Sequence, residues 1–459
     1  MRLEQFLVKS QKALRIVKEQ GLSALLDRMK SNVDPARDFD FTQRSALSTS
    51  PKTERKAIFV GRILNKNQLV SKIQVDLSDK NTRISFSHDD YLSSVGGLQI
   101  SVTDEQEEVN AAGNNYLHIF PYGASLTLTK FDLNSIIGIN LNGKRIGYTN
   151  PDTFLESLQV IIESAPLEQI SIHHTMGFDL AFIEKAIMIA GEPKVRFWLH
   201  DFFSVCPGYL LLRNNIEFCG APDVSSNACG LCVYGTDRQE HLVEFERFFS
   251  QNAIEVISPS EFALDLWKRS FPIKGVMASV CPHAYLEYQQ PAVIKPQNST
   301  IRIAFVGFPV HHKGWSTWQR LTERFGSDSR YEFFLFSETR RRSENFKHIP
   351  VSVTKDTRSQ MSDMLQGQGI DVAFLWSICP ETFSYTLYES LAAGCVVLTN
   401  PDSGNIQSYV RDHPEAGMVL DDENTLMELF DGKGIVDLVA ERQTAGKKIT
   451  KLVITHDCK

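Results

Sequence analysis

The chain has 459 residues, which is more than one common domain holds, so we expect two or three domains. Its hydrophobic share of 42% and charged share of 22% are typical of a soluble globular protein. The net charge of −7 argues against a nucleic-acid partner, and the lack of any run of about 18 apolar residues argues against a transmembrane helix.

Residues 1–32 predict a basic amphipathic helical extension. Apolar residues recur at helical spacing, and seven basic residues stand against three acidic ones. Such a helix suits an anionic membrane surface, which would bind residues 1–30, but it equally suits docking on the protein's own domain or on a partner. Residues 33–55 are rich in Ser, Thr, Asp and Pro and predict a linker.

Residues 56–290 predict a first α/β domain of Rossmann-like order. Strand patterns alternate with helical patterns, and an insertion containing cysteines occupies 206–232. Ligands of such sheets bind at the carboxyl ends of the strands. The predicted strands are Ala57–Val60, Thr82–Phe86, Tyr116–Pro121, Ile170–Ile172, Val195–Leu199 and Ile254–Ser258.

Polar side chains follow two of these strands directly. His173 and His174 end one strand, and His200 and Asp201 end the next. Each is a candidate for the active site, because it lies where ligands of parallel sheets bind. A structural role, such as holding the loop, is the alternative for any of these histidines.

A glycine pair lies before a predicted helix of the first domain. Gly96 and Gly97 follow the strand that ends at Phe86. Two glycines let the backbone approach a ligand closely at a helix N-terminus, although the same pair can simply form a turn.

Four cysteines lie within a short loop-like stretch, and the last two form a C-x2-C pair. Four thiolates would fit a closed tetrahedral site, which predicts a structural zinc ion, and buried free thiols are the alternative. The remaining four cysteines are scattered and predict packing residues in a reducing, cytoplasmic setting. The clustered cysteines are Cys206, Cys219, Cys229 and Cys232, and the scattered ones are Cys281, Cys379, Cys395 and Cys458.

Residues 291–459 predict a second Rossmann-like domain after a hinge at 289–298. Ile301–Gly307 opens it as a buried parallel strand, and Tyr331–Phe336 and Val351–Val353 predict later strands. Lys313 lies between a loop and a helix, where a point charge suits a phosphate group.

The most informative stretch runs from the strand Asp371–Trp376 to the strand Cys395–Leu398. Between them, Thr382 or Ser384 can cap a helix that ends at Gly394. A helix N-terminus attracts an anion such as a diphosphate. The carboxylates at positions 381 and 389, both glutamates, can accept hydrogen bonds from the hydroxyl groups of a sugar or a ribose.

This stretch resembles the nucleotide-sugar signature of retaining GT-B glycosyltransferases, and most of all the large bacterial family that builds surface polysaccharides. The resemblance rests on Glu381-x7-Glu389 and the Leu-Ala-Ala-Gly-Cys-Val-Val turn after it. It implies that Glu381 acts as a catalytic residue holding the transferred sugar and that Glu389 binds the ribose. The backbone N–H groups of Phe383 and Ser384 would bind the diphosphate.

Other positions receive roles from the same resemblance. Gly96 and Gly97 would face the phosphates and the acceptor, and His173, rather than His174, would lie near the reacting carbon of the sugar. Lys313 would grip the donor diphosphate. The chain departs from the family where an Arg usually follows the strand's glycine, because Phe308 and Pro309 occupy that place.

The resemblance implies an α/β fold with two Rossmann-like domains facing a cleft. It implies transfer of a sugar from a UDP- or GDP-sugar to a glycan or lipid-linked acceptor in cell-surface polysaccharide biosynthesis. The chemistry would require no cofactor, because a helix dipole and a lysine can neutralise the leaving diphosphate. The protein would lie in the cytoplasm, peripherally on the inner face of the cytoplasmic membrane.

The leading alternative is a non-catalytic GT-B scaffold or a partner subunit of a glycosyltransferase, and the missing Arg favours it. An NAD-dependent oxidoreductase is disfavoured, because no G-x-G-x-x-G opens either predicted domain. The long crossover helix that usually returns to the first domain is not evident, so a longer parent protein stays open.

Overall fold

The computed structural model describes residues 61–77, 80–94, 96–123, 125–271, 273, 275–288, 300–354, 357–444 and 450–455. The predicted extension at 1–32, the linker at 33–55 and the strand Ala57–Val60 lie outside the described residues, as does the hinge at 289–298. In the described part of the chain, no helix is long and apolar enough to cross a membrane.

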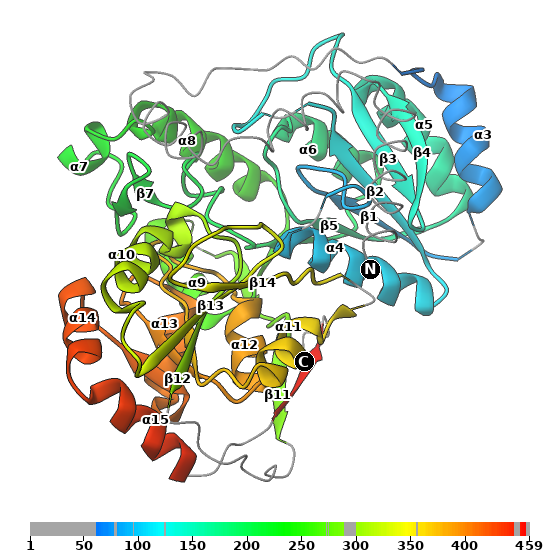
Figure 1. Ribbon diagram of the computed structural model, residues 1–459. Helices are drawn as coiled ribbons and strands as arrows, with labels where there is room; N and C mark the ends of the chain where they lie inside the picture. The colour runs from blue at the N-terminus through cyan, green and yellow to red at the C-terminus, as the bar shows by residue number, and fades with distance from the viewer. Residues whose placement is uncertain are drawn as a thin grey trace.

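Two α/β units, each built on its own sheet, lie one above the other in Figure 1. The first sheet has eight described strands in the order β10-β9-β6-β5-β1-β2-β3-β4. They are parallel except for the edge hairpin of β3 and β4. Their bounds are β1 Thr82–Phe86, β2 Asn115–Pro121, β3 Ile137–Leu141, β4 Lys144–Thr149, β5 Leu167–Ile172, β6 Lys194–Trp198, β9 Ile254–Ser258 and β10 Met277–Val280.

Helices with capped N-termini connect these strands. Asn150 caps α5, and Ser260 caps α9 by accepting a hydrogen bond from the amide of Ala263. The apolar stripes of these helices pack on the sheet and form one hydrophobic core. The helices are α3 Lys66–Asp76, α4 Gly97–Ala111, α5 Pro151–Ser164, α6 Leu180–Ile189, α7 Asn227–Gly230, α8 Gly235–Gln251 and α9 Glu261–Ser270, and a small hairpin joins β7 Leu212–Arg213 to β8 Glu217–Phe218.

The second sheet has six described strands, all parallel, in the order β14-β13-β12-β15-β16-β17. Hydrophobic clusters cover both faces of the sheet, as expected for parallel strands buried between helices. The strands are β12 Ile301–Val306, β13 Tyr331–Phe336, β14 Lys347–Ile349, β15 Val372–Phe374, β16 Val396–Thr399 and β17 Gly417–Val419.

The segments between these strands are short helices, and one strand pair lies apart from both sheets. β11 Ala284–Tyr288 pairs antiparallel with β18 Thr450–Ile454, and the pair contacts α12. The helices are η1 His311–Lys313, α10 Trp315–Phe325, α11 Gln360–Gly367, α12 Tyr385–Ala392, α13 Asn405–Asp412, η3 Pro414–Ala416, α14 Glu423–Asp431 and α15 Gly434–Thr444.

The predicted fold class is confirmed: the protein is α/β, with two Rossmann-like domains built on mainly parallel sheets. One strand prediction is wrong, because Val351–Val353 is not a strand and β14 lies before it, at Lys347–Ile349. The pairing extends past β14 by one hydrogen bond, from the amide of Val351 to the carbonyl oxygen of Ser337 at 3.3 Å. The partner strand β13 ends at Phe336, so Val351–Val353 lies beyond the end of the ladder.

Candidate functional site

A cleft of about 780 Å³ lies between the two domains and is lined by both. The lining comes mainly from segments that follow the carboxyl ends of strands, where ligands of parallel sheets bind. In the first domain these segments follow β1, β5 and β6. In the second they follow β12, β13 and β15. Residues that line the cleft include His88, Gly96, Gly97, His174, His200, Asp201, Phe308, Lys313, Arg358, Glu381, Ser384 and Glu389.

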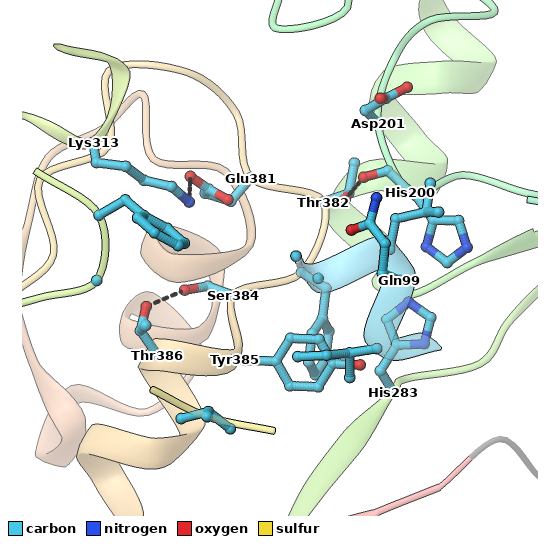
Figure 2. A pocket seen from close by; sticks show the side chains of 18 of the residues that line it. Gln99, His200, Asp201, His283, Lys313, Glu381, Thr382, Ser384, Tyr385 and Thr386 are labelled. Carbon is cyan, nitrogen blue, oxygen red and sulfur yellow. Dashed lines mark hydrogen bonds and ion pairs between the residues drawn. The ribbon is translucent and has the colours of Figure 1, made fainter. Parts of the chain in front are cut away.

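Lys313 and Glu381 form an ion pair in this cleft, as Figure 2 shows. Lys313 Nζ donates to Glu381 Oε1 at 2.6 Å, and Ser377 Oγ donates to the same oxygen at 2.8 Å. Burial alone would raise the pKa of Glu381, but the nearby Lys313 ammonium and these hydrogen bonds hold it below its ordinary value. The pair therefore stays charged and presents a cation and an anion together.

A glycine next to Lys313 fixes the path of the backbone. Gly314 has φ +82°, and a Cβ atom there would lie 2.2 Å from the carbonyl oxygen of Trp376. The tight packing of η1 against the end of β15 therefore requires glycine at 314, and it brings Lys313 to the start of the loop that carries Glu381.

α12 begins at the cleft beside Glu381. Ser384 caps it, accepting from the amide of Leu387 at 3.4 Å, and its Oγ lies 3.0 Å from Oγ1 of Thr386 (Figure 2). The amide of Ser384 donates to Asn405 Oδ1 at 3.4 Å. The first-turn amides of a helix have no partner within the helix, so this end can receive an anion.

Glu389 lies farther along α12 and lines the same cleft. It is only 5% exposed, and its carboxylate makes no hydrogen bond with any described residue. Burial raises the pKa of Glu389 to about 7, although the Arg358 guanidinium opposes the shift. A buried carboxylate without hydrogen bonds can accept them from the hydroxyl groups of a ligand.

The predicted glycine pair also lines the cleft, at the start of α4. A Cβ atom on Gly97 would lie 3.9 Å from the ring of Tyr385 on α12. Gly96 has an extended backbone with φ 177°, a conformation open to any residue. The pair therefore faces the first turn of α12, and a role toward phosphates stays a prediction.

The structure separates the tandem histidines that follow β5. His174 lines the cleft and pairs with Asp201, with 2.8 Å between Nε2 and Oδ2. His173 is 2% exposed and lies behind the lining, 2.7 Å from Glu105 and 3.0 Å from His200. His173, favoured from the sequence, thus reaches the cleft only through His200, and its catalytic role stays a prediction.

Several cleft or near-cleft residues did not emerge from the sequence. Arg358 pairs with Asp104 of the other domain, and the rings of His283 and Tyr385 stack 6.0 Å apart, centroid to centroid.

The burial of Glu105 could have been predicted from the sequence, because Glu105 lies at helical spacing with the buried residues Ser101, Val102 and Val109 of α4. A charged residue on an apolar stripe indicates a buried polar network.

The zinc prediction is not supported. Cys206, Cys219, Cys229 and Cys232 are free thiols, and no group of three or more metal-binding side chains that could hold an ion occurs among the described residues. Arg238 is buried there and donates to Cys229 Sγ at 3.4 Å. This guanidinium places a positive charge against a sulfur that zinc would need.

One of the other cysteines differs from the sequence prediction as well. Cys281 is disulfide-bonded, whereas Cys379 and Cys395 are buried, as predicted for packing residues, and Cys458 lies outside the described residues.

No family model and no curated protein matches this chain. Among solved structures it is similar to sucrose-phosphate synthase from Thermosynechococcus elongatus, with a TM-score of 0.46 and 14% identity, covering 80% of this chain and 95% of that one. A glycosyltransferase from Rickettsia africae has a TM-score of 0.46 and 12% identity, covering 81% and 95%. Anabaena Alr3699/HepE, solved in complex with UDP-glucose, has a TM-score of 0.45 and 10% identity, covering 79% and 94%. The similar structures thus include glycosyltransferases, as the sequence resemblance predicts, and at these TM-scores they decide nothing about the activity of this chain.

Proposed function

We propose that the protein is a retaining glycosyltransferase that moves a sugar from a nucleotide-diphosphate sugar to an acceptor hydroxyl group. The observation that carries the proposal is that Lys313, Glu381, Glu389 and the start of α12 converge on one cleft between the domains. A cation beside a helix N-terminus suits a diphosphate. The two carboxylates suit the hydroxyl groups of a sugar and a ribose.

The reaction exchanges one bond at the anomeric carbon for another. The bond to the phosphate oxygen breaks, and its electron pair leaves with the nucleoside diphosphate. The acceptor oxygen forms the new bond on the same face of the sugar, which is what retention means, and its proton passes to the leaving phosphate oxygen. Lys313 and the first-turn amides of α12 stabilise the negative charge on the leaving diphosphate. Glu381 stays ionised beside Lys313 and holds the transferred sugar.

The donor in this proposal is a UDP- or GDP-sugar, and the acceptor is a glycan or a lipid-linked sugar of cell-surface polysaccharide biosynthesis. The support for this setting is the sequence resemblance of the Glu381–Glu389 stretch. The same setting would place the protein at the inner face of the cytoplasmic membrane, with residues 1–30 as its membrane contact.

Calorimetry with a nucleoside diphosphate and with the matching nucleotide sugar tests the proposal. Glu389→Gln should weaken binding of both ligands by one to two powers of ten, because each loses a charged hydrogen-bond acceptor worth about 1.5–3 kcal/mol. Glu381→Gln should spare the free nucleoside diphosphate and lower turnover of the nucleotide sugar. Glu338→Gln is the matched control, since Glu338 is an exposed carboxylate of the same cleft. Equal losses for both ligands in both variants would contradict the two roles.

A second candidate is a GT-B scaffold that binds nucleotides without turnover. Phe308 favours it, because this apolar side chain is 47% exposed in the cleft where the family usually has a phosphate-binding Arg. Screening the full chain against UDP- and GDP-sugars separates the two candidates. Binding with neither donor hydrolysis nor transfer supports the scaffold, whereas a product with the anomeric configuration of its donor supports the retaining enzyme.

A further inference from the structure

A buried glutamine on the first-domain wall of the cleft has only half of its amide group paired. Gln99 lies in the first turn of α4, is 8% exposed and lines the cleft. Its Nε2 donates to both carboxylate oxygens of Asp89, at 2.8 and 2.9 Å, whereas its Oε1 accepts no hydrogen bond from the described residues. Side chains this buried normally have their polar atoms paired, so an open acceptor here indicates a place for a donor on a ligand.

Asp89 determines which way the amide of Gln99 faces. Asp89 lies on the loop after β1 and is half-buried behind the lining of the cleft. Carboxylate oxygens accept hydrogen bonds, so the NH₂ group of Gln99 must face Asp89. An amide turned the other way would place three acceptor oxygens together, and they would repel one another. Figure 2 shows the side chain of Gln99 extending from the start of α4 into the space between the domains.

Gly96 leaves room for the amide oxygen of Gln99. The backbone of Gly96 is extended, with φ 177°, so its conformation alone does not require glycine. A Cβ atom on Gly96 would, however, lie 2.5 Å from Gln99 Oε1. Alanine at this position would therefore displace the flexible end of Gln99 and leave the backbone in place.

The open oxygen restricts the chemistry of a ligand at the start of α4. An amide oxygen can only accept hydrogen bonds, so it opposes the oxygen of an ionised phosphate, which also only accepts. The first-turn amides of α4 are donors without a partner inside the helix. A hydroxyl group can donate to Gln99 Oε1 and also accept from such an amide. A sugar hydroxyl group therefore fits this place better than a diphosphate does.

We propose that Gln99 binds a hydroxyl group of the sugar acceptor, and that Asp89 and Gly96 are positioning residues that hold its amide oxygen toward the cleft. This role rests on the proposed glycosyltransferase function. The acceptor is the source that fits, because every group that the proposed function assigns to the donor lies on the second domain, whereas α4 belongs to the first.

Nitrogen NMR of the full chain with ¹⁵N-labelled glutamine tests the orientation without any substrate. The side-chain amide of Gln99, assigned by the signal lost in Gln99→Met, should exchange its hydrogens with water slowly, because the carboxylate of Asp89 holds them. Asp89→Ala should make this exchange fast. Asp265→Ala removes an exposed carboxylate on α9 and should leave the exchange slow. Fast exchange in the wild type, or slow exchange in Asp89→Ala, would overturn the proposal.

Deoxy sugars test the hydrogen bond to the acceptor. The probes are methyl glycosides of common hexoses, each also prepared with single hydroxyl groups replaced by hydrogen. Gln99→Met keeps the length of the side chain but removes the acceptor atom. It should lower kcat/KM for the glycoside about three- to tenfold, the size of one neutral hydrogen bond, and leave the Kd of UDP unchanged. Gln74→Met, on the exposed side of α3, is the control and should change neither value.

The coupling between variant and probe identifies the bonded hydroxyl group. One deoxy glycoside should lose the same factor with the wild type and lose nothing further with Gln99→Met, as expected when both changes remove one hydrogen bond. Asp89→Ala and Gly96→Ala should behave like Gln99→Met toward that glycoside. Independent losses for every deoxy glycoside would contradict the proposal. Transfer to none of the glycosides, by a chain that hydrolyses its donor, would also count against a sugar at this place.

Binding without an acceptor separates the two sources of a sugar hydroxyl group. If Gln99→Met weakens binding of the nucleotide sugar but not of UDP, the hydroxyl group belongs to the transferred sugar and the acceptor assignment is wrong. A general loss of structure in any variant would weaken UDP binding as well. If the wild-type chain binds and turns over no nucleotide sugar, the proposed function fails, while the NMR result still decides whether Asp89 orients Gln99.

Discussion

At the scale of single residues, Glu389 combines a structural cost with a binding function. Its carboxylate is buried without a hydrogen bond from the described residues, and its pKa rises from 4.5 to about 7. The unfolded chain loses the proton near the ordinary value of 4.5, whereas the folded chain keeps it up to about 7. Between these values the folded state binds more protons, so its stability falls as the pH rises through this window.

We therefore predict that Glu389→Gln stabilises the protein without ligand, and more so at higher pH. The unfolding free energy of the variant minus that of the wild type should grow by up to about 3 kcal/mol between about pH 4.5 and pH 8, since each pKa unit is worth about 1.4 kcal/mol. Urea unfolding of both proteins at several pH values measures this difference in unfolding free energy. Glu428→Gln, an exposed glutamate on α14, is the control. A difference that does not change with pH would refute the buried-charge argument.

The same carboxylate should couple nucleotide binding to proton release. Ribose hydroxyl groups donate hydrogen bonds to the charged form and therefore lower the pKa of Glu389 in the complex. At about pH 6.5, where much of the free protein is protonated at Glu389, UDP binding should release a proton, and UDP affinity should rise toward about pH 8. Calorimetry in two buffers of different ionisation enthalpy counts the proton. Release that persists in Glu389→Gln would assign the effect to another group.

At the scale of elements, the bounds of several strands and the cap of a helix could be predicted from the sequence. The strands β1, β9 and β13 have the predicted bounds, and Ser384, one of the two predicted caps, caps α12. These features depend on neighbours within about four residues, which the sequence displays directly. The position of β14 was predicted wrongly, because it depends on pairing with β13, a partner that the local sequence does not display.

One loop contact holds Glu381 in place and gives a prediction at this scale. Gly404 lies directly before α13 with φ +67°, and a Cβ atom there would lie 2.4 Å from the amide nitrogen of Glu381 and 2.5 Å from its carbonyl oxygen. Gly404→Ala should therefore move Glu381 away from Lys313, lower turnover of the nucleotide sugar at least tenfold, and destabilise the fold by about 1–3 kcal/mol.

A second glycine, Gly191, provides a control that distinguishes the steric clash in Gly404→Ala from the strain of a left-handed backbone. Gly191 has φ +75°, but a Cβ atom there would meet no atom within 4 Å. Gly191→Ala should cost only the strain of the left-handed conformation, about 1 kcal/mol, and should leave turnover unchanged. Thermal unfolding and donor hydrolysis of both variants make the comparison. Equal turnover in the two variants would show that Glu381 does not depend on the loop at 404.

At the scale of the whole molecule, contacts between the domains close the cleft. Ser260 Oγ donates to the carbonyl oxygen of Thr382 at 2.7 Å. Thr382 Oγ1 donates to the carbonyl oxygen of His200 at 2.6 Å, as Figure 2 shows. Two domains with a cleft were predictable from alternating strand and helix patterns. These contacts were not, because their partners lie 122 and 182 positions apart in the chain.

An ion pair across the cleft supplies the prediction for the whole molecule. Arg358 of the second domain pairs with Asp104 on α4 of the first, and both side chains are largely buried. Asp104→Asn removes the charge but keeps the shape, so it should weaken the closed arrangement by about 1 kcal/mol and raise the open population several-fold.

Small-angle X-ray scattering measures this opening. Asp104→Asn should show a larger radius of gyration than the wild type, and saturating UDP should reduce the difference, because a ligand held by both domains favours closure. Asp76→Asn breaks the exposed pair with Lys144 inside the first domain and should leave the radius unchanged. If Asp104→Asn scatters like the wild type with and without UDP, the ion pair does not control the opening of the cleft.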